Sequence, residues 1–248
     1  MIRVELHAHT SDDQEDLLPY SAHDLIRRAA ALGYGALAVT LHDTPWDPAP
    51  SFAFARELGV RLIPGIERTI QGSHVLVLNT PVEAALAVRR LEDLAPFKAA
   101  WPNALIVAPH PCFPISTALG RERLDAFRGV WDAIEVNAMY VAGVDFNRGA
   151  MAWARANGVP LVGNSDVHRL TQLGRTWSEV DVDIPPDMSD AAAADAICAA
   201  IRAGRVRVVS RRLSYAFAAV ITTQMTIGGI RGRRRPRRPH AGVGRDAL

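Results

Sequence analysis

Short apolar runs alternate with amphipathic stretches along most of the chain. Residues 36–40 and 104–108 consist of Ala, Val, Leu and Ile apart from one closing Thr. Uninterrupted apolar runs of this length are typical of strands buried on both faces of a parallel sheet. Between such runs, residues 22–32 and 189–203 place apolar side chains three and four positions apart, which predicts helices. The alternation therefore predicts repeated strand–helix units joined by short turns.

Capping residues mark the predicted helix boundaries. Ser21 is the predicted N-cap of the helix at 22–32, with Asp24 at the third position after it, and Gly33 ends this helix. Similar signals predict helices at 51–58, 81–98, 121–127 and 144–157. The remaining predicted strands are 3–6, 61–66, 74–78, 133–137, 160–163 and 206–209.

The number of predicted strands bears on the fold class. Seven or eight buried strands within about 210 residues favour an α/β barrel over an open sheet. An open doubly wound sheet is the alternative, but its functional site draws on fewer strands. No Gly-rich phosphate loop follows a predicted strand, which argues against a nucleotide-binding architecture.

The composition fits a soluble globular protein. Of the 248 residues, 49% are hydrophobic and 22% are charged, and the length suits one large α/β domain or two small ones. Cys112 and Cys198 define no disulfide framework, which predicts free thiols in a reducing compartment. The sequence opens directly into a strand without a basic and apolar leader, so we expect a cytoplasmic location.

Charge divides the chain unevenly. Residues 1–200 contain 16 Lys and Arg against 25 Asp and Glu, whereas residues 201–248 contain 12 against 1. We predict a main domain at 1–210, an apolar segment at 211–230 that forms a helix, and a basic tail at 231–248. The tail lacks apolar periodicity, which predicts disorder. We expect no membrane insertion, because polar residues interrupt the apolar segment, and no nucleic-acid function for the tail. The sequence leaves the oligomeric state open.

Histidines and acids gather at the ends of the predicted strands. His7 and His9 close the first strand, and residues i and i+2 of an extended chain share a face, so both imidazoles project together. Glu67 and Asp166 follow later strands. Six of the eight histidines adjoin an apolar run, namely His7, His9, His42, His74, His110 and His168. Neutral imidazole is a common ligand for divalent metals, so the pattern predicts a metal cluster. Taken alone, the first pair also fits ordinary core or surface histidines.

Six short motifs, in order, make the chain resemble the PHP family, named for its polymerase and histidinol phosphatase members. They are His7-Ala8-His9-Thr10, Thr40-Leu41-His42-Asp43, Pro64-Gly65-Ile66-Glu67, Ser73-His74-Val75-Leu76, Ala108-Pro109-His110-Pro111 and Gly163-Asn164-Ser165-Asp166-Val167-His168. The likeness runs from about residue 3 to about residue 209. It implies a distorted (β/α)7 barrel with ligands at the carboxyl ends of the strands, and it makes residues 1–210 the catalytic domain.

The resemblance also implies two or three divalent metal ions, and nitrogen and oxygen ligands suit Mn, Fe or Zn. The set implied around a first metal is His7, His9, Glu67 and Asp166. The set implied around a second is Glu67, as a bridge, with His74 and His110. A third set joins His42 and His168 to an acid from the segment after Thr10. In that segment Asp12, Asp13, Glu15 and Asp16 compete, and the spacing favours Glu15.

One position departs from the family pattern. The usual Thr-Asp-His reads Thr40-Leu41-His42 in this sequence. A carboxylate at that position is expected to orient nearby ligands by hydrogen bonding, which leucine cannot do. We therefore predict two tightly held metals and a weaker third.

The resemblance implies hydrolysis of phosphate esters of a small metabolite or nucleotide by metal-activated water, without a protein nucleophile. Asp166 or His168 would relay a proton, and Arg175, in the loop that follows, would grip the substrate phosphate. One alternative is amidohydrolase-like C–N hydrolysis, disfavoured because Lys98, the only lysine, lies in a predicted helix. The other is a catalytically silent metal-binding regulatory module with a nucleic-acid-binding tail. Leu41 favours this module, and the retained ligands argue against it.

Overall fold

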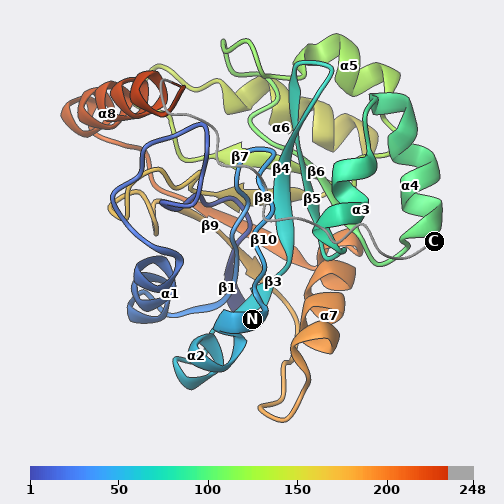
Figure 1. Ribbon diagram of the computed structural model, residues 1–248. Helices are drawn as coiled ribbons and strands as arrows, with labels where there is room; N and C mark the ends of the chain where they lie inside the picture. The colour runs from blue at the N-terminus through green and yellow to red at the C-terminus, as the bar shows by residue number, and fades with distance from the viewer. Residues whose placement is uncertain (234–248) are drawn as a thin grey trace.

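The computed structural model describes residues 1–233, so most of the predicted basic tail lies outside the described residues. In the described part, ten strands form two five-stranded sheets at the centre of the molecule (Figure 1). The first sheet has the order β10-β9-β1-β2-β3 and consists of β1 (Ile2–Glu5), β2 (Tyr34–Ala38), β3 (Arg61–Ile63), β9 (Thr176–Val180) and β10 (Val206–Ser210). The second has the order β4-β5-β6-β7-β8 and consists of β4 (Gly65–Ile70), β5 (Ser73–Leu78), β6 (Leu105–Ala108), β7 (Ala133–Asn137) and β8 (Leu161–Asn164).

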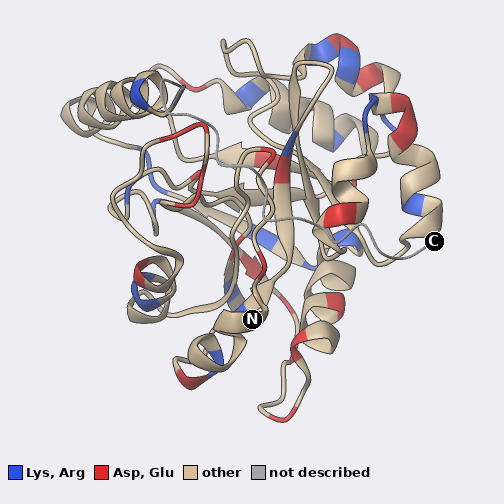
Figure 2. Cartoon of the chain, viewed as in Figure 1, with Lys and Arg blue, Asp and Glu red and all other residues tan. Residues whose placement is uncertain are grey.

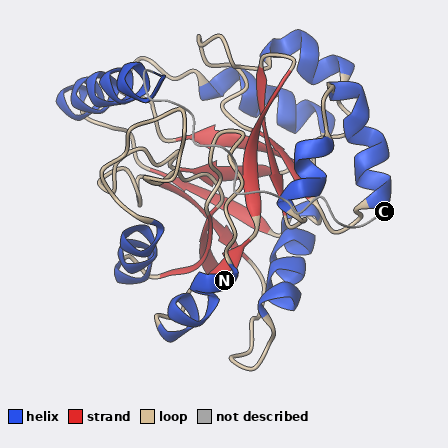
Figure 3. Cartoon of the chain, viewed as in Figure 1, coloured by secondary structure: helices blue, strands red, loops and turns tan. Residues whose placement is uncertain are grey.

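Helices surround the sheets, so the predicted α/β fold class is confirmed (Figure 3). The helices are α1 (Ala22–Ala31), α2 (Phe52–Glu57), α3 (Val82–Ala87), α4 (Leu94–Ala100), α5 (Gly120–Ala126), α6 (Asn147–Asn157), α7 (Asp190–Arg202) and α8 (Tyr215–Arg233). Short 3-10 turns at Ala49–Ser51 and Leu91–Asp93 precede α2 and α4. Ser21 caps α1 as predicted, and its side chain accepts a hydrogen bond from the amide of Asp24.

The strands are not all parallel, which corrects the expectation of uniform strand–helix units. β1, β2 and β3 are parallel, as are β6, β7 and β8, but β5 is antiparallel to both β4 and β6. Gln71 and Gly72 join β4 to β5, and both have positive φ, as a tight hairpin turn requires. Because β5 runs backwards, its first residues lie beside the carboxyl end of β4. His74 therefore stands opposite Thr69, at the same edge as the other predicted ligands.

Two predicted elements were each divided in the structure, and one strand was missed. The strand predicted at 61–66 is two strands, because Pro64 has no amide hydrogen with which to continue the ladder. The helix predicted at 81–98 is divided into α3 and α4. A continuous helix would place Pro96 in its interior, whereas restarting at Leu94 keeps this proline in the first turn. β9 was missed, although Thr176–Val180 alternates β-forming residues in the manner of a strand.

The two sheets close into a distorted barrel through β8. β3 leads into β4 at one junction, and β8 contacts β9 and β10 at the other. At the second junction the Gly163 amide donates a hydrogen bond to Ser178 Oγ over 2.9 Å, and Ser178 Oγ donates to the Gly163 carbonyl over 3.1 Å. A Cβ at position 163 would lie 2.7 Å from the Trp177 carbonyl oxygen. The junction therefore needs glycine.

We expect Gly163→Ala to destabilise the fold by about 2–3 kcal/mol, because the added methyl group overpacks a junction lined by backbone. For a chain of this size that loss lowers Tm by about 5–10 °C in a thermal unfolding experiment. Gly129→Ala is the matched control, because nothing lies within 4 Å of a Cβ at that position. Equal Tm values for the two variants would show that β8 can move away from β9 and β10 without cost.

α7 covers one end of the barrel core. Its Ile197 and Ile201 are fully buried in one apolar cluster with Val4 of β1, Val107 of β6 and Val162 of β8. Side chains from these four separate elements therefore share this core, which holds the strand ends at fixed positions relative to one another.

α8 forms a final helix along one side of the molecule (Figure 1). It agrees with the predicted helical segment at 211–230 but begins at Tyr215 and continues to Arg233. Ile221 is buried against the body, whereas Val220, Ile227 and Ile230 are about half exposed. Within the described residues, no helix is both long enough and apolar enough to cross a bilayer.

Candidate metal centre

Hydrogen bonds bring the ends of β1, β2 and β8 together. The Leu6 amide donates to Asn164 Oδ1 over 3.1 Å, and the Ala8 amide donates to Thr40 Oγ1 over 3.1 Å. Single bridges then pair Ala8 with Val167 and His42 with Glu67. Each bridge joins positions that flank or include predicted ligands. The six motifs therefore converge at one edge of the barrel.

The structure brings eight of the nine predicted metal ligands into one cluster. Within the described residues, four groups have potential ligand atoms that all lie within 4.8 Å of one another. The groups are His7–His9–Asp166, His7–Glu67–His110, His42–Glu67–His74 and His9–His42–His168. All eight of these side chains are buried. The groups share members, so the cluster is continuous and does not consist of isolated sites.

Glu67 is the central side chain of the cluster. Its Oε2 lies 3.1 Å from His7 Nε2, 3.4 Å from His9 Nε2 and 3.2 Å from His42 Nε2. Its Oε1 lies 2.7 Å from His74 Nδ1 and 3.4 Å from His110 Nε2. A carboxylate with both oxygens among five imidazoles can link two metal positions. This geometry fits the bridging role that the family resemblance implies.

The hydrogen-bonding state of the cluster fits divalent metals. His7 Nε2, His9 Nε2 and both carboxylate oxygens of Glu67 are buried without a hydrogen-bond partner. His74 Nδ1 and His110 Nδ1 are in the same condition. Leaving a buried polar atom unpaired costs about 1–3 kcal/mol. Several unpaired atoms at one place therefore indicate a missing partner. Imidazole nitrogens and carboxylate oxygens are the donor set of Zn, Mn and Fe sites.

Two of the ligands have strained backbones. His110 has φ of 30° and Asp166 has φ of 49°, in the left-handed region that residues other than Gly and Asn rarely occupy. Such strain costs about 1–3 kcal/mol per residue and is concentrated at functional sites. The surrounding hydrogen bonds hold Asp166 in this conformation, since Asn137 Nδ2 donates to its Oδ2 over 3.2 Å.

Opposite charges dominate the electrostatics of the cluster. Burial alone would lower the pKa of His7, but the carboxylates of Glu67 and Asp166 hold that pKa well above its ordinary value. Burial would raise the pKa of Glu67, but His74, His7 and His42 hold it well below. Glu67 therefore stays ionised, and in the absence of metal His7 tends to bind a proton in its place.

Glu135 orients two histidines, a role that the sequence analysis did not predict. His7 Nδ1 lies 2.8 Å from Glu135 Oε2, and the His110 amide donates to Glu135 Oε1 over 3.2 Å. Donation from Nδ1 fixes the tautomer of His7 and leaves Nε2 directed at the cluster. Asn137 and Asn164 donate to the same carboxylate over 2.9 Å. Glu135 is therefore a positioning residue.

Asp13 and Asp16 contact the cluster histidines. Asp13 Oδ2 lies 3.0 Å from His9 Nδ1 and 2.9 Å from His42 Nδ1, and it also accepts a hydrogen bond from the His42 amide. Asp16 Oδ2 lies 3.0 Å from His168 Nε2. Glu15, predicted as a ligand, belongs to none of the four groups among the described residues; its amide donates to Asp13 Oδ1. The choice of Glu15 among the four acids of this segment stays a prediction.

Leu41 in place of the usual Asp does not leave His42 without an orienting carboxylate. Its side chain is fully buried in an apolar cluster, and Asp13 supplies the carboxylate that orients His42. The orienting role expected at position 41 is thus filled from a different segment of the chain.

We expect Asp13→Asn to weaken metal binding at the group formed by His9, His42 and His168 by about 10- to 100-fold. An amide can still donate or accept one hydrogen bond, but it no longer stabilises two Nδ1–H donors at once. Metal titration followed by calorimetry measures the change. The exposed neighbour Asp12 provides the control variant Asp12→Asn, and equal affinities in both variants would exclude the orienting role.

The predicted arginine lies outside the cluster. The guanidinium carbon of Arg175 lies 4.6 Å from the ring centre of Phe217 in α8, and Arg175 belongs to none of the ligand groups of the described residues. Arg68, beside Glu67 in the sequence, is also turned away, because it pairs with Asp43 and donates to the Ala85 and Val88 carbonyls. Asp166 and His168, predicted to be catalytic, do lie together, with Asp166 Oδ1 3.3 Å from His168 Nδ1.

Two sequence comparisons connect parts of the chain to known proteins. A family model described as PHP-associated matches residues 145–206. One segment is similar to the DNA polymerase III PolC-type of Streptococcus suis (strain 98HAH33), with 34% identity over 85 residues. That segment is 34% of this chain but 6% of the polymerase, so the chain corresponds to a small part of the relatives that it matches.

Solved structures share the fold over most of the chain. PsfC from Pseudomonas syringae PB-5123 has a TM-score of 0.61 and 22% identity, covering 93% of this chain and 99% of that one. A two-domain protein of Bacteroides vulgatus ATCC 8482, which contains a predicted PHP-like metal-dependent phosphoesterase, has a TM-score of 0.59 and 18% identity, covering 85% and 65%. The lesion-specific endonuclease PfuEndoQ from Pyrococcus furiosus has a TM-score of 0.57 and 15% identity, covering 89% and 66%.

The matched model, the shared fold and the order of the six motifs confirm the family resemblance. Residues 145–206 match a PHP-associated family model, and the chain shares the distorted α/β barrel fold of these solved structures.

Proposed function

We propose that this protein is a metal-dependent hydrolase of phosphate esters that acts on a small phosphorylated substrate. The observation that carries the proposal is the continuous cluster of six histidines and two acids around Glu67, with its unpaired buried atoms. Two or three divalent ions of Mn, Fe or Zn fit these ligands. In the third group Asp13 and Asp16 contact the histidines, and Asp13 takes the orienting role that Leu41 cannot fill, so we propose that this group also holds an ion.

Different residues of the chain would hold the metals, orient the ligands and move a proton. When bound, the metals supply Lewis-acid activation of water and of the phosphoryl oxygens. His7, His9, Glu67 and Asp166 would hold the first position, and Glu135 would keep His7 in its binding tautomer. Asp166 and His168 are in contact, so we propose that they move the proton that leaves the attacking water.

The test is release of phosphate from generic monoesters in the presence of added Mn. We expect His9→Ala and Asp166→Ala to abolish turnover, because His9 belongs to two ligand groups and Asp166 supplies the carboxylate of the group with His7 and His9. His23→Ala is the matched control: His23 lies in α1, contacts Ser51 and belongs to no ligand group of the described residues. Undiminished turnover in the first two variants would refute the assignment. An inactive wild-type protein with tightly bound metal would instead favour the silent regulatory module.

A phosphodiester in nucleic acid is the second candidate. It is favoured by the fold shared with PfuEndoQ and by seven arginines in residues 231–248. The described surface gives it less support. Lys and Arg alternate with Asp and Glu on the outer helices (Figure 2). A cavity of about 940 Å³ beside Thr44 is lined by Asp47, Glu83 and Asp190 and by no Lys or Arg. Cleavage of an oligonucleotide at a higher kcat/KM than any monoester would select this candidate.

Amidohydrolase-like chemistry through a carboxylated lysine is disfavoured by the position of Lys98. Its Nζ lies 2.8 Å from Asp132 Oδ1 and donates to the Val130 carbonyl over 2.9 Å. Lys98 belongs to α4, on the outside of the barrel, and the chain has no other lysine.

A further inference from the structure

A second cavity, of about 450 Å³, lies directly against the metal centre. His110, Asn137 and Asp166 form its inner end. His110 and Asp166 are members of the ligand groups, and Asn137 donates a hydrogen bond to Asp166. A molecule that fills this cavity would therefore touch the metal ligands at one end, while the rest of it lies between the surrounding side chains.

Aromatic rings extend from the cluster along one side of the cavity. The ring centres of His110 and Phe113 are 6.3 Å apart at an edge-on angle, and those of Phe113 and Phe146 are 5.6 Å apart. Phe146 is 41% exposed, and Ile115 and Val144 beside it are 48% and 47% exposed. Large apolar side chains are rarely left exposed together at one place unless something binds there.

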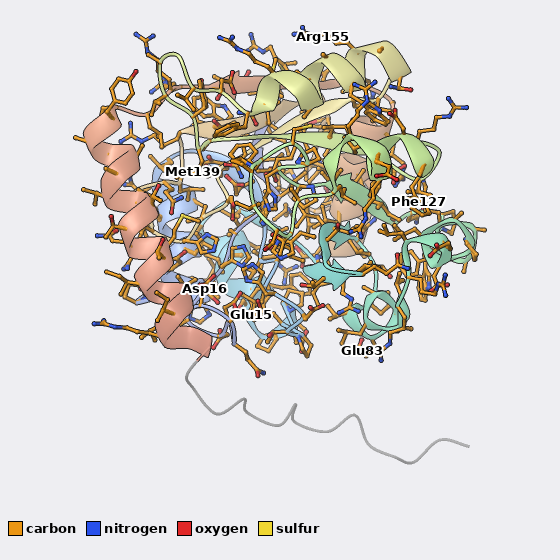
Figure 4. The ribbon with its side chains drawn as sticks, turned by 90° about the horizontal axis from the view of Figure 1, so that it is seen from above. Glu15, Asp16, Glu83, Phe127, Met139 and Arg155 are labelled. Carbon is orange, nitrogen blue, oxygen red and sulfur yellow. The ribbon has the colours of Figure 1, made fainter. Side chains whose placement is uncertain are left out.

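α8 forms the opposite side. Ala218, Thr222 and Met225 of this helix line the cavity together with Met139 of the facing loop. Figure 4 shows Met139 beside α8, near the middle of the helix. The loop and the helix are joined, since the Leu213 amide donates to the Tyr140 carbonyl over 2.9 Å and Tyr215 Oη donates to the Ala142 carbonyl over 2.5 Å. Methionine and small side chains make a smooth apolar wall that suits flat groups.

Charge is nearly absent from the cavity. His110 and Asp166 are the only ionisable side chains of its described lining besides the hydroxyl of Tyr140, and no Lys or Arg is among them. Arg175 lies against Phe217 and Arg68 pairs with Asp43, and Arg169, next to His168 in the sequence, is not among the described lining residues. A second phosphate or a carboxylate on the substrate would find no cation here, and burying it unpaired would be strongly unfavourable.

We propose that the phosphate ester hydrolysed at this site carries an uncharged aromatic alcohol, whose ring occupies the cavity between Phe113, Phe146 and Met225 while its phosphate lies at the metal centre. This inference rests on the proposed function and defines its substrate class. The cavity is large enough for one or two rings, and offset or edge-on contacts with the phenyl groups favour an aromatic group over an aliphatic one of equal size.

The test compares esters of alcohols with similar acidity, so that leaving-group chemistry does not set the rates. We expect kcat/KM with 2-phenylethyl phosphate to exceed that with ethyl phosphate and glycerol 1-phosphate by at least about 30-fold, since the ring leaves water on binding. Binding of the corresponding phosphonates to the metal-loaded protein, followed by calorimetry, gives the same comparison without turnover. We expect 2-phenylethylphosphonate to bind at least about 30-fold more tightly than ethylphosphonate.

Single substitutions test whether the preference for the aromatic ester arises in the cavity. Phe146→Ala should lower the ratio of the two kcat/KM values, aromatic over ethyl, by about tenfold, mainly through KM for the aromatic ester. Val144→Arg should place a cation in the cavity lining and raise kcat/KM for an ester that carries a second anionic group, such as 3-phosphoglycerate, relative to ethyl phosphate. Trp101→Ala is the matched control, because Trp101 is 39% exposed and lies outside the cavity. It removes an aromatic side chain of similar exposure and should leave the ratio unchanged.

The outcomes separate this inference from the proposed function. Turnover of all three esters at similar kcat/KM would overturn the substrate class and leave the hydrolase intact. No turnover of any ester would count against the hydrolase, and the phosphonate affinities would then decide whether the cavity binds an aromatic group. Equal affinities for the two phosphonates would overturn the inference in either case.

Discussion

Replacing Glu67 by glutamine is expected to reduce phosphoester turnover by at least about 1,000-fold. The substitution keeps the shape of the side chain but removes the negative charge that contacts five histidines. An amide holds divalent metals much less well, and the charge stabilisation that such metals supply amounts to several kcal/mol in the transition state. Since each 1.36 kcal/mol is a factor of ten in rate, the expected loss follows. Steady-state kinetics at saturating Mn measure it, and elemental analysis measures the lost metal.

The exposed Glu92 provides the control for this prediction. It forms ion pairs only with Arg90 on the surface, so Glu92→Gln should leave turnover and metal content unchanged. A Glu67→Gln protein that keeps its full metal content and activity would contradict the central position given to this carboxylate.

Removing the metals is expected to lower Tm by at least about 10 °C. A ligand present at a thousand times its Kd stabilises the folded state by about 4 kcal/mol, and one kcal/mol corresponds to about 2–4 °C for a chain of this size. The loss arises because His7 Nε2, His9 Nε2 and both carboxylate oxygens of Glu67 are buried without a hydrogen-bond partner. Thermal unfolding before and after chelation measures the change, and returning Mn should restore the original Tm.

The difference in Tm between the metal-loaded and the metal-free protein should increase as pH rises. Burial alone would lower the pKa of His42, but Glu67 and Asp13 raise it to about 10 in the metal-free protein. A histidine whose pKa is raised on folding contributes stability that is fully present below its unfolded pKa and is lost as pH rises through the folded pKa. Metal affinity instead increases as pH rises, because the ligands must lose their protons before they bind metal. We therefore expect a larger chelation effect at about pH 9 than at about pH 6.

His9→Ala provides the comparison for chelation. This variant lacks a ligand that belongs to two groups, so chelation should change its Tm much less than that of the wild-type protein. An equal drop in both proteins, or none in either, would show that the cluster holds no stabilising metal.

The sequence was a good guide to the ligands because their placement depends on local rules. A strand directs residues i and i+2 to one face, and strands in a barrel end at a common edge, so a cluster of strand-end histidines and acids was expected. The family resemblance then implied that His7, His9, Glu67 and Asp166 share one site. The same local rules located α1 and its cap at Ser21, because capping involves neighbouring residues only. The reversal at β5 was missed, although Gln71-Gly72 is a turn signal.

The residues that orient the ligands were not predicted, because their contacts join distant parts of the chain. Glu135 lies 128 positions from His7, and Asp13 lies 29 positions from His42. Sequence spacing narrowed the acid after Thr10 to four candidates, but Asp13 and Asp16 reach the histidines only because that loop folds back over the ends of β1 and β2. Arg175 was assigned to the substrate for want of the information that α8 returns to cover it.

The sequence by itself therefore determined the fold class and the side chains that form the histidine and carboxylate cluster, since hydrophobic period and strand-end position are properties of short segments. Only the tertiary structure decided how those side chains are shared between groups, which acids hold them, and which surface receives the substrate. Those features depend on distances between segments that the packing of β8 against β9 and of α8 against the barrel sets, and no local pattern encodes such distances.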